Sequence, residues 1–320
     1  MHACYKWGPV ARSELLTVGE SFEDLVFIGL DRAPRAGEEV KTSTLVRTLG
    51  GSALITATAA ARLGLPTQLI SGLGEEAEDR TREEGLAVTN LRLDGEPQAV
   101  SCVLSTRANR SLVTFNGVND HLEPRFLDAV REVATRHAHF AFYPRDCGHW
   151  ADVVDRLRER GVTTSWDFGW NEGLLSDRAF ARLVNGLDYV FVNEQEAPLY
   201  TRRLTLADAV AAWSSHPRNV ILKLGAKGSH WIGGGNDVEV PGIRVKAVDT
   251  SGAGDAFAGG FLVALLRGHS PKTCLRLGNF VGGMATRAAG GIESLPRVDD
   301  VPEALRHALE PKVAPRPTPA

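Results

Sequence analysis

The sequence has few cysteines, no long apolar run and almost no excess charge, and each of these absences excludes a class of protein. Its 320 residues include four cysteines, which lie far apart and form no C-x-x-C pair. This spacing argues against a zinc site or a disulfide framework and fits a reducing compartment. The formal net charge is −3, so we expect no nucleic-acid partner and no membrane partner.

Other signals are missing as well. Residues 1–13 mix charged residues and proline with apolar ones, which does not fit a signal peptide or a membrane span, and we expect a cytoplasmic protein. The nine histidines show no metal-ligand spacing. No G-x-G-x-x-G follows the first predicted strand, which argues against a dehydrogenase that binds a dinucleotide. Residues 311–320 contain four prolines, and we expect a disordered tail over 310–320.

The sequence is 43% hydrophobic, and short β-branched runs alternate along it with longer helical stretches. This alternation predicts an α/β fold with a doubly wound, mostly parallel sheet and helices on both faces. The predicted strands are 15–18, 68–71, 139–142, 163–166, 189–192 and 220–224. The predicted helices are 52–63, 123–135, 150–160, 206–214, 256–266 and 273–288.

One region breaks the alternation. Residues 25–30, 40–49, 100–105 and 112–115 read as strands without a helix inside either pair. We expect these segments, within about 25–49 and 99–116, to form a separate small β-sheet. A lid of this kind would exclude water from a reacting phosphate, whereas the simpler alternative is a plain hairpin extension.

The most informative stretch is VDTSGAGDAF at 248–257, which leads into an apolar helix. Gly252, Ala253 and Gly254 allow a tight turn, so that successive N–H groups at the helix start can face an anion. An acidic residue suits such a place as the group that takes a proton from an attacking hydroxyl, and Asp255 is the candidate base. The alternative is an ordinary N-capped helix.

This stretch resembles the C-terminal signature of the PfkB, or ribokinase-like, family of carbohydrate kinases, D-T-x-G-A-G-D-x-F, at all seven fixed positions. The resemblance implies that Asp255 is the catalytic base and that Gly252, Ala253 and Gly254 form an anion hole. It also implies that Asp249, with Thr250, lies near a monovalent-cation site, which K⁺ would occupy.

Paired glycines, Gly50 and Gly51, stand before a helix of small residues that ends in A-R-L-G, and this segment is similar to the N-terminal signature of the family. Where that signature has Asn, this chain has Ile55, which cannot hydrogen-bond a substrate. Asp24 stands where relatives place a substrate-binding Asp, and a carboxylate at the sheet edge can accept bonds from two sugar hydroxyls. A solvated turn residue is the alternative for Asp24.

The nucleotide half carries weaker patterns. Asn193 and Glu196 match the N-x-x-E motif of the family, which helps to place Mg²⁺ and its waters, although the same spacing is typical of a helix cap. The segment K-L-G-A-K-G resembles T-x-G-x-x-G, and it gives three candidates for contact with ATP, Lys223, Gly225 and Gly228. By resemblance, Asn279 lies on a helix that forms one wall of the adenine pocket.

Further departures concern the acceptor. Where many relatives read D-x-N-x-R, this chain has Gly169 and Asn171, so a phosphorylated or acidic acceptor is less expected. Trp166 and Trp170 could stack on a sugar or a base, although core packing is the simpler interpretation of each. In the predicted lid turn, Arg107 and Arg110 flank Asn109 and could supply a cation instead.

The sequence therefore predicts a ribokinase-like kinase domain over 14–309. The implied activity is ATP-dependent, Mg²⁺-dependent phosphorylation of a hydroxyl on a small sugar or sugar-like molecule, with a homodimer formed through the lid. A nucleoside kinase of the same fold is one alternative. A non-catalytic sugar or nucleotide sensor is another, because of the departures at Ile55, Lys223, Gly169 and Asn171.

Overall fold

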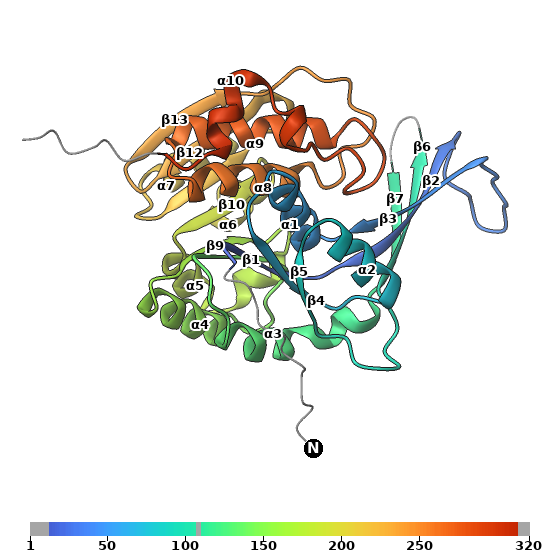
Figure 1. The fold of residues 1–320 in the computed structure, drawn as a ribbon, viewed down its shortest axis with the longest axis horizontal. Coiled ribbons are helices and arrows are strands. Elements are labelled where there is room, and N and C mark those ends of the chain that lie inside the picture. Colours follow the sequence, from blue (N-terminus) through green and yellow to red (C-terminus); the bar gives the residue numbers. More distant parts are fainter. Residues whose placement is uncertain (1–12, 107–109, 313–320) are drawn as a thin grey trace, which may run out of the picture.

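The computed structural model describes residues 13–106 and 110–312. They form one large sheet with helices on both faces and a separate small sheet that projects to one side (Figure 1). The prediction of a doubly wound α/β fold with a small β-sheet lid is confirmed.

The large sheet has the order β13-β12-β11-β10-β9-β8-β1-β4-β5. It is parallel from β11 to β5, and β12 and β13 pair antiparallel at the other edge. Its strands are β1 (Leu15–Gly19), β4 (Thr67–Ser71), β5 (Ala87–Asn90), β8 (His137–Ala141), β9 (Thr163–Asp167), β10 (Tyr189–Asn193), β11 (Asn219–Lys223), β12 (Gly228–Gly233) and β13 (Asn236–Pro241).

The helices cover the two faces through two apolar layers. One layer contains α1 (Ser52–Arg62), α2 (Glu75–Glu83), α8 (Ala253–Leu266), α9 (Pro271–Ala285) and α10 (Glu303–Arg306). The other contains α3 (Leu122–Arg131), α4 (Cys147–Glu159), α5 (Phe180–Gly186), α6 (Glu196–Thr201) and α7 (Leu206–Ser214). Because both faces are covered, every residue of β1, β4 and β8 is buried.

Local sequence signals fix where several helices begin. The side chains of Asp146, Thr205 and Ser270 accept hydrogen bonds from backbone N–H groups in the first turns of α4, α7 and α9. In α9 this cap is followed by Pro271 at the first helical position, which needs no N–H partner. None of the helices in the described part of the chain is long and apolar enough to cross a membrane.

The small sheet is the lid, with the order β3-β2-β6-β7. Its strands are β2 (Phe22–Leu30), β3 (Thr44–Gly50), β6 (Val100–Thr106) and β7 (Arg110–Phe115). β2 pairs antiparallel with β3 and parallel with β6, and β7 is an edge strand in which every residue is exposed.

Three differences from the predicted elements matter. β2 begins at Phe22, so Asp24 lies inside a lid strand, opposite Thr48 of β3, and not in a turn after β1. β3 begins at Thr44, four residues later than predicted. The prediction also missed α2, α5, α6, β5, β12 and β13; α2, for example, buries only Ala77 and Thr81 and so carries no apolar stripe.

Candidate active site

The carboxyl ends of the parallel strands meet at one edge of the large sheet, and α8 begins above them. The turn before α8 is made possible by Gly252, the N-cap residue, which has φ +70°. A Cβ added at Gly252 would lie 2.7 Å from Ile55 Cδ1. Ile55 therefore packs under the turn as a buried apolar residue, and does not replace the hydrogen-bonding Asn of the family signature.

Asp255 lies in the first turn of α8 and is hydrogen-bonded to the side chain of Ser52, the first residue of α1. Thr56 of α1 also donates to the Asp255 carbonyl oxygen at 3.0 Å. Burial raises the pKa of the Asp255 carboxyl to about 7; the negative charge of Asp167 adds to this rise, and Lys223 opposes it. A carboxyl with a pKa near neutrality is suited to accept a proton from an alcohol.

Asp24 and Gly50, both predicted to hold the acceptor, are in contact across the lid strands. A Cβ added at Gly50 would overlap the Asp24 carboxylate. Burial raises the pKa of Asp24 to about 7, and the charge of Asp249 adds to the rise. Gly51 has φ +101° and is the N-cap of α1. The chain therefore runs from Gly50, in contact with the Asp24 carboxylate, through Gly51 to Ser52, which is the partner of Asp255.

Lys223 ends β11, and its ammonium donates to the Asp167 carboxylate at the end of β9. The two side chains are 13% and 7% exposed, respectively. Although burial lowers the pKa of Lys223, the charges of Asp167, Glu196 and Asp255 raise it overall above its ordinary value. A Cβ added at Gly254 would lie 3.2 Å from Lys223 Nζ, so the ammonium lies against the turn that starts α8.

Asn193 and Glu196 form one hydrogen-bonded unit between β10 and α6. Glu196 Oε1 accepts from Asn193 Nδ2 at 2.7 Å, and Oε2 accepts from Asn193 N at 2.9 Å. Burial raises the pKa of Glu196 to about 7, and the charge of Asp167 adds to the rise. In the described ranges 13–106 and 110–312, no group of three or more His, Cys, Asp or Glu side chains is arranged to hold a metal directly.

The remaining nucleotide candidates follow β11 or lie on α9. Gly225 has φ +56° and would have open space around an added Cβ, whereas one at Gly228 would overlap the Val240 carbonyl oxygen. Gly225 can therefore accept the close approach of a ligand, and Gly228 is needed for packing against β13. Asn279 is buried and donates to the carbonyl oxygens of Val240 and Pro241, each at 3.2 Å.

Asp249 connects the turn to the lid. Its Oδ1 accepts from Ser251 N at 2.9 Å and from Arg110 Nη1 at 3.0 Å, and its Oδ2 accepts from Gly290 N at 3.3 Å. Burial alone would raise the pKa of Asp249, but these hydrogen bonds and the charge of Arg110 lower it below its ordinary value. Arg110 is the first residue of β7; Arg107 and Asn109 lie outside the described residues.

The two tryptophans do not form a pair. Trp166 is fully buried among aromatic side chains and donates to the Phe142 carbonyl oxygen, whereas Trp170 is 49% exposed. Asn171 caps a short 3₁₀ turn by accepting from Gly173 N at 2.9 Å. The interpretation of Trp166 as a stacking residue is therefore wrong, because strand alternation turns it into the core layer beneath α4.

Sequence reasoning missed Asp167 and Ser52 as members of the site. Asp167 directly follows the predicted strand 163–166 and is the last residue of the observed β9, so its place at the binding edge could have been inferred from the sequence. Ser52 follows the paired glycines directly. The contact between Lys223 and Asp167 had no such signal, since β10 lies between their two strands.

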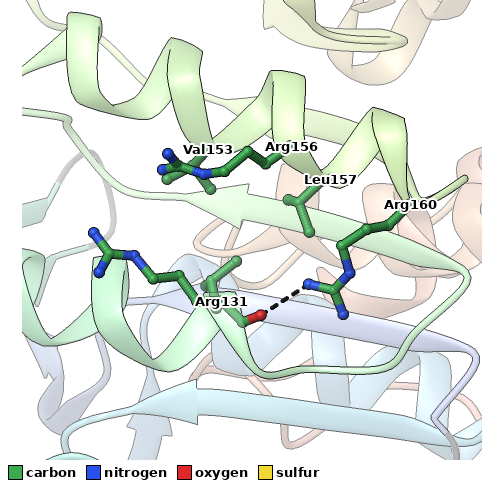
Figure 2. Close-up of a pocket in the computed structure, with 6 residues that line it drawn as sticks. Arg131, Val153, Arg156, Leu157 and Arg160 are labelled. Atoms are coloured by element: carbon green, nitrogen blue, oxygen red, sulfur yellow. Dashed lines mark hydrogen bonds between the residues drawn. The ribbon is translucent and has the colours of Figure 1, made fainter.

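A groove of 490 Å³ lies elsewhere, between α3 and α4. Figure 2 shows Arg131, Arg156 and Arg160 around it, and Arg160 Nη1 donates to the Arg131 carbonyl oxygen at 2.9 Å. It is lined by Val130, Arg131, Val153, Arg156, Leu157 and Arg160. None of the predicted site residues lines this groove, so the chemistry described above belongs to the sheet edge.

Comparison with known proteins agrees with this geometry. The family model for pfkB family carbohydrate kinases matches residues 12–298. The chain is 25% identical over 303 residues to a ribokinase of Bacillus subtilis, covering 91% of this chain and 99% of the relative. It is 29% identical over 285 residues to an ATP-dependent ribose-1-phosphate kinase of Halopiger xanaduensis, covering 86% and 93%.

Among solved structures, Arabidopsis thaliana ribokinase complexed with ribose and ATP aligns with a TM-score of 0.72 at 23% identity, over 93% of this chain and 99% of that chain. The family match covers nearly the whole chain, including the Asp255 turn and the lid. The protein belongs to the pfkB family of carbohydrate kinases and is an ATP-dependent carbohydrate kinase.

Proposed function

We propose that this kinase transfers the γ-phosphate of ATP to a hydroxyl of a small sugar or sugar-like molecule, with Asp255 as the base. The observation that carries the proposal is the position of Asp255. It stands in the first turn of α8, directly after the Gly252–Gly254 turn, and is hydrogen-bonded to Ser52 next to the paired glycines of α1.

In this mechanism the acceptor is held by Asp24, Gly50 and Gly51. The Asp24 carboxylate accepts hydrogen bonds from acceptor hydroxyls, and the glycines let the acceptor approach the backbone. Asp255 then removes the hydroxyl proton as the oxygen attacks phosphorus in line. The backbone amides of Gly252, Ala253 and Gly254 take up the charge that develops on the transferred group.

For the nucleotide, we propose that Asn193, Lys223, Gly225, Gly228 and Asn279 line the binding site. Glu196 suits Mg²⁺ through bridging water, since its oxygens are hard donors that already accept bonds from Asn193. When bound, Mg²⁺ would neutralise phosphate charge. We place K⁺ at Asp249, whose carboxylate now pairs with Arg110.

We also propose a homodimer that forms through the lid. Leu112, Val113 and Phe115 of the edge strand β7 are 55%, 69% and 55% exposed. An edge strand with exposed apolar side chains is a surface on which a second copy can add. We propose a cytoplasmic location, where ATP is available and where Cys102, Cys147 and Cys274, which are free in the described residues, would stay reduced.

The test is phosphotransfer by wild-type protein and by Asp255→Asn. Hexoses, pentoses, ketoses, keto-acids and nucleosides are screened with ATP and Mg²⁺, and product is detected by mass. Asp255→Asn should lower kcat by roughly 10²- to 10⁴-fold and leave ATP affinity within about threefold, since only the base is lost. Asp237→Asn, at a side chain that is 85% exposed, is the control. Near-normal turnover by Asp255→Asn would show that the base is another group.

A further inference from the structure

Two features of its position, burial and the start of α8, disfavour the Lys223 cation, and nearby carboxylates outweigh them. Its ammonium is largely buried and lies against Gly254 in the first turn of α8, at the positive end of the helix dipole. A helix of 14 residues repels a cation at that end. Removing the ammonium from water adds a second cost, and the position therefore needs an explanation.

Part of the compensation comes from Asp167. The Asp167 carboxylate accepts a hydrogen bond from Lys223 and also from Gly169 N at 3.3 Å. To reach it, the Lys223 side chain passes over β10, because the two residues end β11 and β9. The pair therefore fixes the ammonium at one point, and does not leave it free to follow a ligand.

The fixed ammonium and the amino end of α8 bring positive charge from two elements to the same place. Around them stand the carboxylates of Glu196 and Asp255, which also act on Lys223. These carboxylates would repel an anionic phosphoryl group, so the ammonium and the amino end of α8 are the groups that can attract it. Positive groups already held in position need no reorganisation during a reaction.

We propose that Lys223 is a catalytic residue that stabilises the phosphoryl group during transfer, and that Asp167 is the positioning residue that holds it against the Gly254 turn. This inference rests on the proposed function and makes it more specific. Lys223 acts mainly on the transition state, and contributes little to the binding of ATP in the ground state. Its loss should therefore lower kcat far more than it raises the KM for ATP.

The competing explanation is that the pair only holds β9 and β11 together. The two explanations separate when both charges are removed at once. Removing one partner of a buried ion pair strands the other charge, whereas replacing both by uncharged residues of similar size is often neutral for stability. A structural pair would then recover stability and activity together.

The experiment compares Lys223→Met, Asp167→Asn and the double variant by thermal melting and by steady-state kinetics with ATP. Each single variant should lower Tm and kcat. The double variant should regain most of the Tm, while its kcat stays about 100-fold below wild type, as after loss of one transition-state donor, with the KM for ATP within about threefold. Recovery of kcat together with Tm would overturn the inference.

Two further variants serve as controls. Glu84→Gln breaks the Arg62–Glu84 pair, whose side chains are 9% and 16% exposed, and should lower Tm without changing kcat. Lys223→Arg keeps the charge and should retain more activity than Lys223→Met; an equal loss would contradict the role of the charge. A wild type without phosphotransfer would overturn the proposed function as well, whereas an active wild type with a recovered double variant would overturn only the role of Lys223.

Discussion

Two buried polar clusters lie on the same face of the large sheet, and they are built in opposite ways. In the first three residues of β8 and the middle of β9, His137 Nε2 and His139 Nδ1 lie 2.7 and 2.8 Å from Ser165 Oγ. Burial lowers the pKa of both histidines to about 3, so they are neutral near pH 7. At the carboxyl end of β9, Asp167 and Lys223 form a charged pair.

The difference between the two clusters indicates a structural role for the histidine cluster and a functional role for the charged pair at the carboxyl ends of the strands. Neutral hydrogen-bonded groups connect strands without leaving a buried charge, which suits a structural role. A charged cluster at the binding edge holds its ionisable groups away from water at a cost in stability, which is typical of functional sites. The comparison gives four tests, from the largest expected effect to the smallest.

The charged cluster at the carboxyl ends of the strands, which includes Asp255, should control the pH dependence of turnover. Burial raises the pKa of Asp255 from its ordinary value of 3.8 to about 7, and a protonated carboxyl cannot accept a proton. Below pH 7, kcat should therefore fall about tenfold per pH unit, to roughly 100-fold below its plateau at pH 5. The measurement is kcat against pH at saturating ATP and acceptor. A flat profile between pH 5 and 8 would remove Asp255 from the rate-limiting step.

The neutral cluster of His137, His139 and Ser165 should affect stability and not turnover. Ser165→Ala removes the hydroxyl that both His137 and His139 contact, and leaves buried ring nitrogens without that partner. We expect unfolding to become easier by about 2–4 kcal/mol, since each unsatisfied buried polar group costs about 1–3 kcal/mol. Urea unfolding monitored by tryptophan fluorescence measures this, with kcat at 25 °C as the paired measurement. A large fall in kcat without a change in stability would show that the histidine cluster has a functional role and not a structural one.

Asp255, the proposed base, should weaken the fold at neutral pH. Because the Asp255 pKa is higher in the folded protein than its ordinary value of 3.8, protonation stabilises the fold at low pH, and this contribution is lost as the pH rises toward 7. Asp255→Asn lacks this titration. It should gain stability relative to wild type between pH 4 and pH 7, by about 2–6 °C in Tm at pH 8. An unchanged difference across that range would contradict the buried, titrating carboxyl.

The contact between lid and turn should matter least. Arg110 pairs with Asp249, and its side chain is 39% exposed, so solvent screens the pair. Arg110→Ala should cost less than about 1 kcal/mol in stability. Arg47→Ala, at a lid arginine that pairs with Glu23, is the matched control. A change in the KM for the acceptor in Arg110→Ala alone would show that the contact reaches the site.

The fold was predictable because its signals are local. Buried parallel strands carry apolar runs that can be seen in the sequence, and the glycines at 50–51 and 252–254 stand where helices must start close to a ligand. Asp255 could be named as the candidate base from its motif alone. The sequence predicts Asp24 and Gly50 as two separate contacts of the acceptor, and the structure brings the two residues together.

The remaining features depend on three-dimensional packing. Asp167 and Lys223 are 56 residues apart, with a strand between them, and no spacing rule connects such positions. The polar helix α2 packs through two small residues, too few for a periodic signal. The placement of Asp24 inside β2 follows from pairing with β3, which local sequence does not encode.

The contact between Asp24 and Gly50 has a consequence for altering which acceptor the enzyme uses. The carboxylate occupies the space that any side chain at position 50 would need, so the two positions behave as one unit. Enlarging position 50 alone would displace the carboxylate that we propose to face the acceptor, while shortening position 24 alone would open a void in the lid. A designer who wants a different sugar must therefore mutate both residues together.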